Sequence, residues 1–179
     1  YGVSRNALND EFLGSLDRSA RILEVGCNIG IQLMCLQRLG FSRLFGIEVQ
    51  SYALREARQL TEGVGLVRGS ALELPFEDAS FDLVFTSGVL IHIGPEHLGR
   101  ALAEIHRCSR RYIWGLEYFA ENHTPIPYRG NDNLMWKGDF AAMYRRQCPD
   151  LALVKERRLP YISDDNVDSM FLLAKDGGG

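Results

Sequence analysis

The chain has 179 residues, 46% of them hydrophobic, which suits one globular domain with a full core. Its net charge of −3 provides no basic field for nucleic acid, and no apolar run reaches membrane-spanning length. No signal peptide is visible, and the four cysteines lack C-x-x-C or zinc-finger spacing, so we expect reduced thiols in a cytoplasmic protein. We predict one domain over residues 1–176, no metal site, and a loose tail at residues 177–179.

The first third of the chain predicts alternating helices and strands. Apolar residues at helical spacing predict a lead-in helix over residues 6–16. A buried strand over 22–25 follows, and a glycine turn connects it to a helix over 31–39. A second strand over 43–48 then leads to a helix over 51–60, for which Ser51 is the predicted cap.

The remaining pattern continues this alternation and ends in two strands. The predicted strands cover residues 64–68, 83–86, 111–118, 151–159 and 169–175. Helices are predicted over 95–107, with Pro95 in the first turn, and over 137–147. The order predicts an α/β fold with a doubly wound, mostly parallel, Rossmann-like sheet of seven strands. A C-terminal antiparallel hairpin closes it, and a crevice lies above the strands at 22–25 and 83–86.

The stretch Glu24-Val-Gly26-Cys-Asn28-Ile-Gly30 connects the first strand to its helix. A strand, a glycine turn and a helix form nucleotide-binding crevices, because the backbone is open and the helix N-terminus offers free N–H groups. The spacing of Gly26 and Gly30 is not the G-x-G-x-x-G of dinucleotide sites. It resembles the first motif of class I S-adenosylmethionine (SAM) methyltransferases, E/D-x-G-x-G-x-G, with Asn28 at the central glycine. The alternative is a turn that only packs a helix on a sheet.

This resemblance implies a set of SAM-binding residues. Glu24 would attract the cationic methionine end, and Glu48, at the end of the second strand, would accept hydrogen bonds from ribose hydroxyls, unless it is only a surface residue. Leu72 and its neighbours would clamp adenine, with Ser70 as a weaker acceptor where many relatives have an acid. The full predicted cofactor set is Glu24, Gly26, Cys27, Asn28, Gly30, Glu48, Val49, Ser70, Ala71, Leu72, Ser87, Gly88 and Val89.

Over its whole length the chain resembles one subgroup of these enzymes, the pseudaminic acid biosynthesis-associated methylases. The resemblance is carried mainly by Leu23–Gly30 (LEVGCNIG), Phe81–Ile93 (FDLVFTSGVLIHI) and Ile126–Gly130 (IPYRG). It implies a class I methyltransferase fold, SAM as donor, S-adenosylhomocysteine as product, and a small acidic, hydroxylated or amino-bearing acceptor of the nonulosonic acid type. The start of the chain is similar to the family's Y-T-x-R-N segment, which implies that Arg5 and Asn6 reach the SAM carboxylate.

Two residues are candidates for the base that removes a proton from a hydroxyl or ammonium acceptor. His92 follows the fourth predicted strand at the crevice edge, and imidazoles titrate near neutral pH. The alternative for His92 is a packed histidine in an apolar turn. Glu117 ends the fifth strand at the same edge, and its alternative is an anchor for the long loop that follows.

The irregular stretch over residues 120–134 is long enough to be a lid or a binding loop. Arg129 is the predicted partner of an acceptor carboxylate, because its planar fork matches that group with two bonds. Tyr118, Tyr128 and Asn131 complete the predicted substrate-binding set. The alternative is a loop fastened to the domain by its own side chains.

The sequence therefore predicts a SAM-dependent methyltransferase that modifies an O or N atom of a small acidic, sugar-like metabolite. Other hypotheses are a methyltransferase for another metabolite, RNA or protein, and a non-catalytic SAM-binding partner protein. A nicotinamide oxidoreductase is disfavoured by the glycine spacing. Arg107, Arg110 and Arg111 are predicted to be a solvated helix end rather than an RNA site. The sequence leaves the oligomeric state open.

Overall fold

The computed structural model describes residues 1–176, so the predicted tail at 177–179 lies outside the described residues. The elements, in chain order, are α1 (Arg5–Leu13), β1 (Arg21–Val25), α2 (Ile31–Arg38), β2 (Arg43–Glu48), α3 (Ser51–Leu60), β3 (Gly65–Arg68), β4 (Phe81–Ser87), the 3-10 helix η1 (Leu90–His92), α4 (Pro95–Cys108), β5 (Ser109–Tyr118), β6 (Thr124–Pro125), β7 (Trp136–Lys137), α5 (Phe140–Gln147), β8 (Leu151–Pro160) and β9 (Val167–Lys175).

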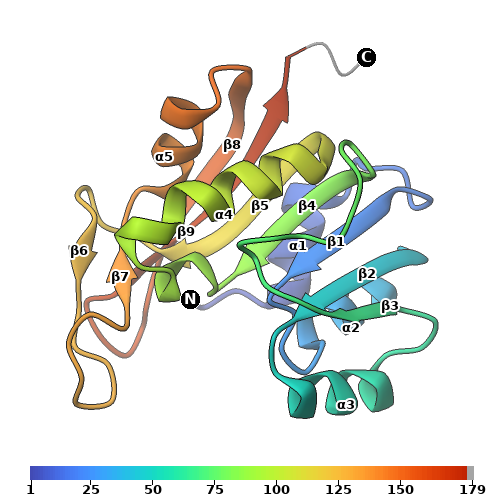
Figure 1. Ribbon diagram of the computed structural model, residues 1–179, viewed down its shortest axis with the longest axis horizontal. Coiled ribbons are helices and arrows are strands. Elements are labelled where there is room, and N and C mark those ends of the chain that lie inside the picture. Colours follow the sequence, from blue (N-terminus) through green and yellow to red (C-terminus); the bar gives the residue numbers. More distant parts are fainter. Residues whose placement is uncertain (177–179) are drawn as a thin grey trace.

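The main sheet has seven strands in the order β3-β2-β1-β4-β5-β9-β8. The first five are parallel, and β9 runs antiparallel between β5 and β8. The predicted mostly parallel sheet with a C-terminal hairpin is therefore confirmed (Figure 1). The strand order reverses between β1 and β4, and ligands of open α/β sheets bind at such a point, outside the carboxyl ends of the strands.

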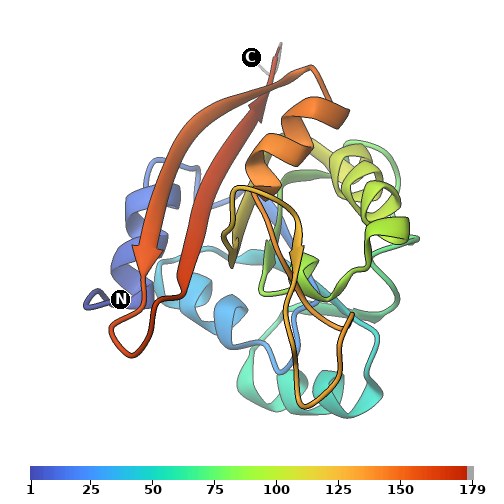
Figure 2. The ribbon, with the colours of Figure 1, turned by 90° about the vertical axis from the view of Figure 1, so that its left-hand side faces the viewer.

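Both faces of the sheet are apolar, and neighbouring residues of one strand supply opposite faces. In β1, Ile22 packs with α1 and α2, whereas Leu23 packs with α4 and α5. In β4, Leu83 likewise packs on the face covered by α1 and α2, and Val84 packs on the face covered by α4 and α5. Figure 1 shows α4 in front of the sheet and α1 behind it, and Figure 2 shows the β8–β9 hairpin between α1 and α5. Two buried layers therefore hold the strand ends in place.

One predicted helix cap and one predicted helix start are wrong, and both involve carboxylates. Ser51 does not cap α3 but is its first residue, since Gln50 holds the cap position and donates its N–H to Glu48 Oε1 at 2.8 Å. Helix α5 starts at Phe140 rather than at residue 137, because Asp139 accepts the Ala142 N–H at 2.9 Å. In both cases a carboxylate at or just after a strand end accepts an N–H where the next helix begins.

Several general expectations can also be compared with the structure. All four cysteines are buried free thiols, as their spacing predicted. Within residues 1–176, no helix has both the length and the hydrophobicity needed to cross a bilayer. The loop predicted over 120–134 is not wholly irregular, because β6 within it pairs with β7 in a separate two-stranded sheet.

Candidate SAM site and adjoining cavity

The glycine turn after β1 is held tightly against β2 and β4. The N–H groups of Gly26 and Cys27 both donate to the Ile47 carbonyl, at 2.8 and 3.0 Å. Gly26 has a φ of +73°, and a Cβ there would lie 2.6 Å from Val89 Cγ2. Gly30 occupies the left-handed cap position of α2 and provides no side-chain cap, so N–H groups at the start of α2 can meet a ligand, except that of Leu33, which bonds to Glu24.

Two buried carboxylates flank this turn, as predicted from their strand-end positions. Glu48 accepts the Asn28 N–H at 3.0 Å with Oε2 and the Gln50 N–H with Oε1, so it ties the turn to the end of β2. Glu24 is 3% exposed, and its Oε2 has no hydrogen-bond partner among the described residues. Burial, opposed by the Arg5 charge, raises the pKa of Glu24 well above its ordinary value. Within residues 1–176, Glu24 forms no ion pair, although the Arg5 charge acts on it.

The predicted adenine segment after β3 forms a compact turn. Ser70 Oγ accepts the Leu72 N–H at 3.1 Å, so the hydroxyl predicted to meet adenine already fixes its own turn. Val49 is 58% exposed at the end of β2, whereas Ala71 and Leu72 are half-buried. The Cys27 side chain belongs to the core on the α2 face, so only its backbone lies at the turn.

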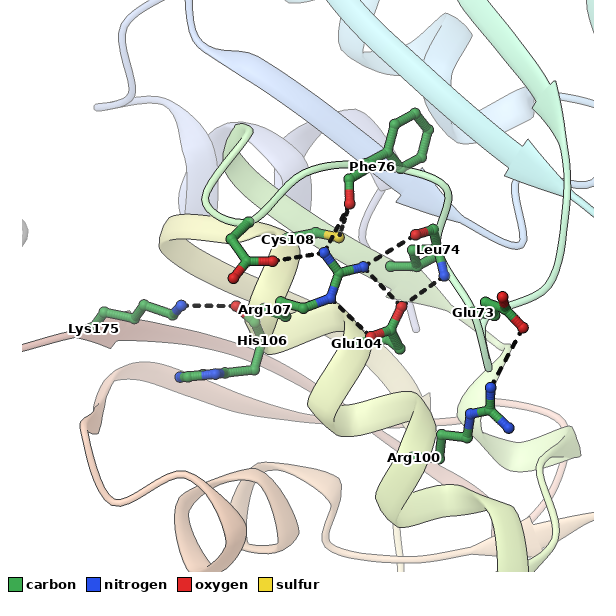
Figure 3. Close-up of polar contacts among 10 residues, drawn as sticks. Glu73, Leu74, Phe76, Arg100, Glu104, His106, Arg107, Cys108 and Lys175 are labelled. Carbon is green, nitrogen blue, oxygen red and sulfur yellow. Dashed lines mark hydrogen bonds and ion pairs between the residues drawn. The ribbon is translucent and has the colours of Figure 1, made fainter.

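Arg107 holds the chain that follows this adenine segment (Figure 3). Its guanidinium donates to the carbonyls of Leu74 and Phe76 at 3.0 and 2.7 Å, and it pairs with Asp78 and Glu104, each at 2.8 Å. These two carboxylates raise the pKa of Arg107 further above its ordinary value. The prediction of a solvated residue is therefore wrong for Arg107, because the sequence did not show that the loop folds back over the end of α4.

The rest of the basic run differs from Arg107. Arg110 pairs with Asp82, and Arg111 is exposed with its guanidinium 4.9 Å from the Tyr112 ring. On α4, His97 is exposed and His106 pairs with Asp150 at 2.9 Å.

Arg5 reaches the end of β4 from the start of α1. Its Nη1 donates to Gln32 Oε1 at 3.0 Å and to Ser87 Oγ at 3.4 Å. Gln32 is 4% exposed and donates in turn to Asn9 Oδ1 at 2.7 Å. Sequence reasoning missed Gln32, although a polar residue on the buried face of an apolar helix was a usable signal. Arg5 is thereby held near the strand ends, and its contact with the SAM carboxylate stays a prediction.

Glu117 lies at the end of β5 and holds the segment that follows β4. Both of its carboxylate oxygens lie near the Val89 N–H, at 3.2 and 3.0 Å. The residue is 1% exposed, and burial outweighs its bonds from Thr86 and the η1 backbone and raises its pKa to about 7. Glu117 therefore anchors η1, and at neutral pH it is close to its own point of half-protonation.

His92 and the predicted substrate loop contact each other. The exposed His92 ring packs edge-on against Tyr128, with centroids 5.4 Å apart, and its Nδ1 lies 3.3 Å from the Leu134 carbonyl. Tyr128 and Asn131 exchange two backbone hydrogen bonds, of 2.9 and 3.0 Å, around a tight turn that carries Arg129. The Arg129 guanidinium lies 5.2 Å from the Tyr128 ring centroid. The loop is thus partly fastened by its own groups.

A cavity of about 220 Å³ opens beside Ser87 and Gly88. Glu117 and Tyr118 line it from β5, and Tyr161 and Asp168 line it from the C-terminal hairpin. The structure thus brings predicted residues of β4 and β5 together, but Tyr128, Arg129 and Asn131 do not line this cavity. Sequence reasoning missed Tyr161 and Asp168, because only the insertion of β9 beside β5 brings them to this edge.

The residues at this edge fit SAM. A buried carboxylate oxygen of Glu24 without a partner suits its ammonium, and Glu48 lies at the strand end where ribose hydroxyls are bound in this architecture. Gly88 lines the cavity, and a Cβ at this position would meet nothing within 4 Å, so the backbone there is open to a ligand.

Comparison with known proteins agrees with this geometry. Residues 23–112 match the family model described as a methyltransferase domain. Since this range covers half of the chain, the chain belongs to that methyltransferase family. The membership confirms the predicted class, the SAM-dependent methyltransferases, with SAM as the cofactor.

Individual relatives cover shorter stretches. A provisionally assigned methyltransferase of Encephalitozoon cuniculi is 32% identical over 122 residues, which are 64% of this chain and 53% of that protein. The 24-methylenesterol C-methyltransferase 2 of Oryza sativa subsp. japonica is 32% identical over 78 residues, 40% of this chain and 22% of that protein. The chain thus matches about half, or less, of the length of these relatives.

A solved structure shares the fold over nearly the whole chain. The 1,6-didemethyltoxoflavin-N1-methyltransferase of Burkholderia thailandensis, solved with its acceptor and S-adenosylhomocysteine bound, superposes with a TM-score of 0.76 at 20% identity. The match covers 95% of this chain and 76% of that one. The class I methyltransferase fold predicted from the sequence is therefore confirmed.

Proposed function

We propose that this protein transfers a methyl group from SAM to an O or N atom of a small metabolite and releases S-adenosylhomocysteine. The observation that carries the proposal is the arrangement around the glycine turn. Glu48 is bonded to the turn at one end, and the partnerless Oε2 of Glu24 lies buried at the other. Family membership supports the same activity.

When bound, SAM supplies an activated methyl group on a sulfonium. The task of the chain is to align the donor with the acceptor and to exclude water. Glu24 would face the ammonium of the methionine end, Arg5 its carboxylate, and Glu48 the ribose hydroxyls. Leu72 and Val49 would flank the adenine ring, and the backbone of Gly26–Gly30 would pass beneath the cofactor.

Proton removal from the acceptor would fall to Glu117 rather than to His92. Glu117 lines the cavity beside Gly88 and has a pKa of about 7, so it can accept a proton at neutral pH. His92 faces the loop, where its contacts with Tyr128 and Leu134 would give it a positioning role. The two predicted candidates for the base thus receive different roles in this proposal.

The proposed acceptor class is a small acidic, sugar-like metabolite, as the resemblance to the pseudaminic acid-associated methylases suggests. The exposed Arg129 would hold its carboxylate, with Tyr128 and Asn131 beside it. The relatives favour a second possibility, because one is named for a sterol and one for the nitrogen heterocycle toxoflavin. A small apolar or heterocyclic acceptor is therefore the alternative.

The test is incubation of the protein with SAM and a panel of acceptors, followed by mass spectrometry. The panel contains nonulosonic acids, their nucleotide-activated forms, amino sugars, small hydroxy and amino acids, sterols and nitrogen heterocycles. The proposal expects one acceptor to gain a methyl group in step with formation of S-adenosylhomocysteine. SAM binding without turnover would favour a non-catalytic partner protein, and absence of SAM binding would refute the proposed function.

A further inference from the structure

The cavity beside Gly88 has two buried carboxylates in its walls, Glu117 and Asp168. They come from β5 and β9, which are neighbours in the sheet. At about 220 Å³, the cavity has room for a small polar group together with the carbon atoms that carry it. Because it opens beside Ser87 and Gly88, predicted cofactor residues, an acceptor placed in it would lie next to the donor.

Asp168 is the less satisfied of the two carboxylates. It is 5% exposed, and its Oδ2 accepts hydrogen bonds from Tyr1 and from Tyr161, the latter at 3.3 Å. Its Oδ1 is buried, and no donor within residues 1–176 reaches it. Burial raises the pKa of Asp168 above its ordinary value, since these hydroxyls and the charges of Arg5 and Lys137 compensate only in part. A buried carboxylate oxygen without a partner is costly, so a bound donor would stabilise it.

Aromatic rings surround this carboxylate. Tyr161 packs edge-on against Tyr1 and against Tyr118, with centroids 5.3 and 5.8 Å apart. Faces of tyrosine rings attract cations, most strongly where water is excluded. Lys137 Nζ already lies 5.6 Å from the Tyr118 centroid, and it is held there by Asn166. Lys137 does not line the cavity, so the interior lacks this cation.

Arg5 is the one basic side chain that lines the cavity, and it faces other partners. It donates to Gln32 and Ser87, and within the described part of the chain it forms no ion pair with Asp168 or Glu117. The walls therefore carry more negative than positive charge. A carboxylate placed here would meet two buried acids, whereas an ammonium would meet a free acceptor and aromatic rings.

We propose that this cavity binds a protonated amine of the methyl acceptor, with the ammonium donating to Asp168 Oδ1 beside the rings of Tyr118 and Tyr161. The acceptor class is thereby narrowed to small molecules with a basic nitrogen. An acceptor that also carries a carboxylate fits only if that group lies outside the cavity, towards Arg129. The inference rests on the proposed function, because it takes the neighbouring edge to be the SAM site.

The test uses n-propylammonium and its neutral analogue n-propanol as probes, with the protein saturated by S-adenosylhomocysteine. Binding is measured by saturation-transfer NMR and titrated to a dissociation constant. Wild type is compared with Asp168→Asn and with the control Asp165→Asn, which removes the same charge from the exposed turn of the same hairpin. Tyr161→Leu, which removes a ring and the hydroxyl that donates to Asp168 Oδ2 but no charge, serves as a second variant if Asp168→Asn does not fold. Calorimetry measures the affinity of each protein for S-adenosylhomocysteine.

The proposal expects n-propylammonium to bind wild type and Asp165→Asn at least tenfold more tightly than Asp168→Asn or Tyr161→Leu. It also expects no binding of n-propanol and affinities for S-adenosylhomocysteine within twofold of wild type. Equal binding of the amine to wild type and the two cavity variants, or no binding to wild type, would overturn it. A loss of S-adenosylhomocysteine affinity in Asp168→Asn would also overturn it, by assigning the cavity to the cofactor. Wild type that binds no S-adenosylhomocysteine would instead refute the proposed function.

Discussion

At the residue scale, Glu48 connects the fold to the proposed cofactor. Its two oxygens accept one backbone N–H each, from Asn28 and Gln50, which leaves further lone pairs for ribose hydroxyls. The same carboxylate would therefore shape the glycine turn and bind the ligand. A change at Glu48 should affect stability and affinity together.

We expect Glu48→Ala to weaken S-adenosylhomocysteine binding at least tenfold, about 1.4 kcal/mol, because a charged acceptor is lost. Stability should fall by about 1–3 kcal/mol, since two N–H groups lose their acceptors. Calorimetry and denaturant unfolding measure the two effects. Glu62→Ala, at an exposed position after α3, is the control and should change neither. Unchanged affinity in Glu48→Ala would remove Glu48 from the cofactor site.

Glu117 should make stability fall as the pH rises. Its folded-state pKa of about 7 is above the ordinary value of 4.5, so the folded protein holds this proton more tightly than the unfolded chain does. The stability due to the protonated form is complete below pH 4.5 and is lost as the pH rises through 7. We expect wild type to lose about 3 kcal/mol more than Glu117→Gln between pH 4.5 and 8. Urea unfolding at several pH values measures the free energy of unfolding of both proteins. The expectation would be contradicted if the two free energies changed in parallel with pH.

The positions of some site residues could be predicted from the sequence, and the positions of others could not. Glu24 and Glu48 end strands that follow one another in a βα pattern, so their common edge could be inferred from chain order alone. Asp168 and Tyr161 could not be placed, because their position depends on β9 entering the sheet beside β5. The hydrogen bonds of Glu117 to η1 were also invisible, because the alternative considered for Glu117 was an anchor for the long loop after β5 and not for the segment after β4.

At the scale of elements, the turn between β1 and α2 depends on the absence of a side chain at Gly26. Gly26→Ala would place a Cβ 2.6 Å from Val89 Cγ2 in a left-handed backbone conformation, so both strain and a clash result. We expect a loss of about 2–4 kcal/mol in unfolding experiments. The control is Gly63→Ala, with a φ of +67° and nothing within 4 Å of its Cβ. It should lose only about 1 kcal/mol, and equal losses would show that the contact with Val89 is unimportant.

The loop after β3 depends in a similar way on Arg107 (Figure 3). Arg107→Lys keeps the charge but cannot reach two carbonyls and two carboxylates at once. We expect a loss of about 1–3 kcal/mol and faster proteolysis within residues 69–80. Arg100 pairs with the exposed Glu73 at 3.4 Å, and Arg100→Lys should change stability by less than about 0.5 kcal/mol. Equal sensitivity of the two variants to protease would contradict the role of Arg107.

At the scale of the whole molecule, the alternating pattern was sufficient to predict the sheet. Parallel neighbours and the terminal hairpin follow from the regular order of strands and helices, and β2 and α3 match their predicted ranges. Contacts between distant loops have no such periodicity, which is why the β6–β7 pair and the cavity at the hairpin were not foreseen. The structure therefore adds most to the sequence-based predictions at the proposed acceptor site.

The most direct test of the account is hydrogen–deuterium exchange of the protein with and without S-adenosylhomocysteine. Bound ligand should slow exchange at the start of α1, around Arg5, and in four segments that meet at the carboxyl edge, residues 24–30, 48–50, 69–72 and 87–89. Exchange at the opposite edge, around Arg43 and Arg110, should not change. Protection confined to these four segments and the start of α1 is the predicted result. Protection elsewhere, or none at saturating ligand, would contradict the claim that this edge binds SAM.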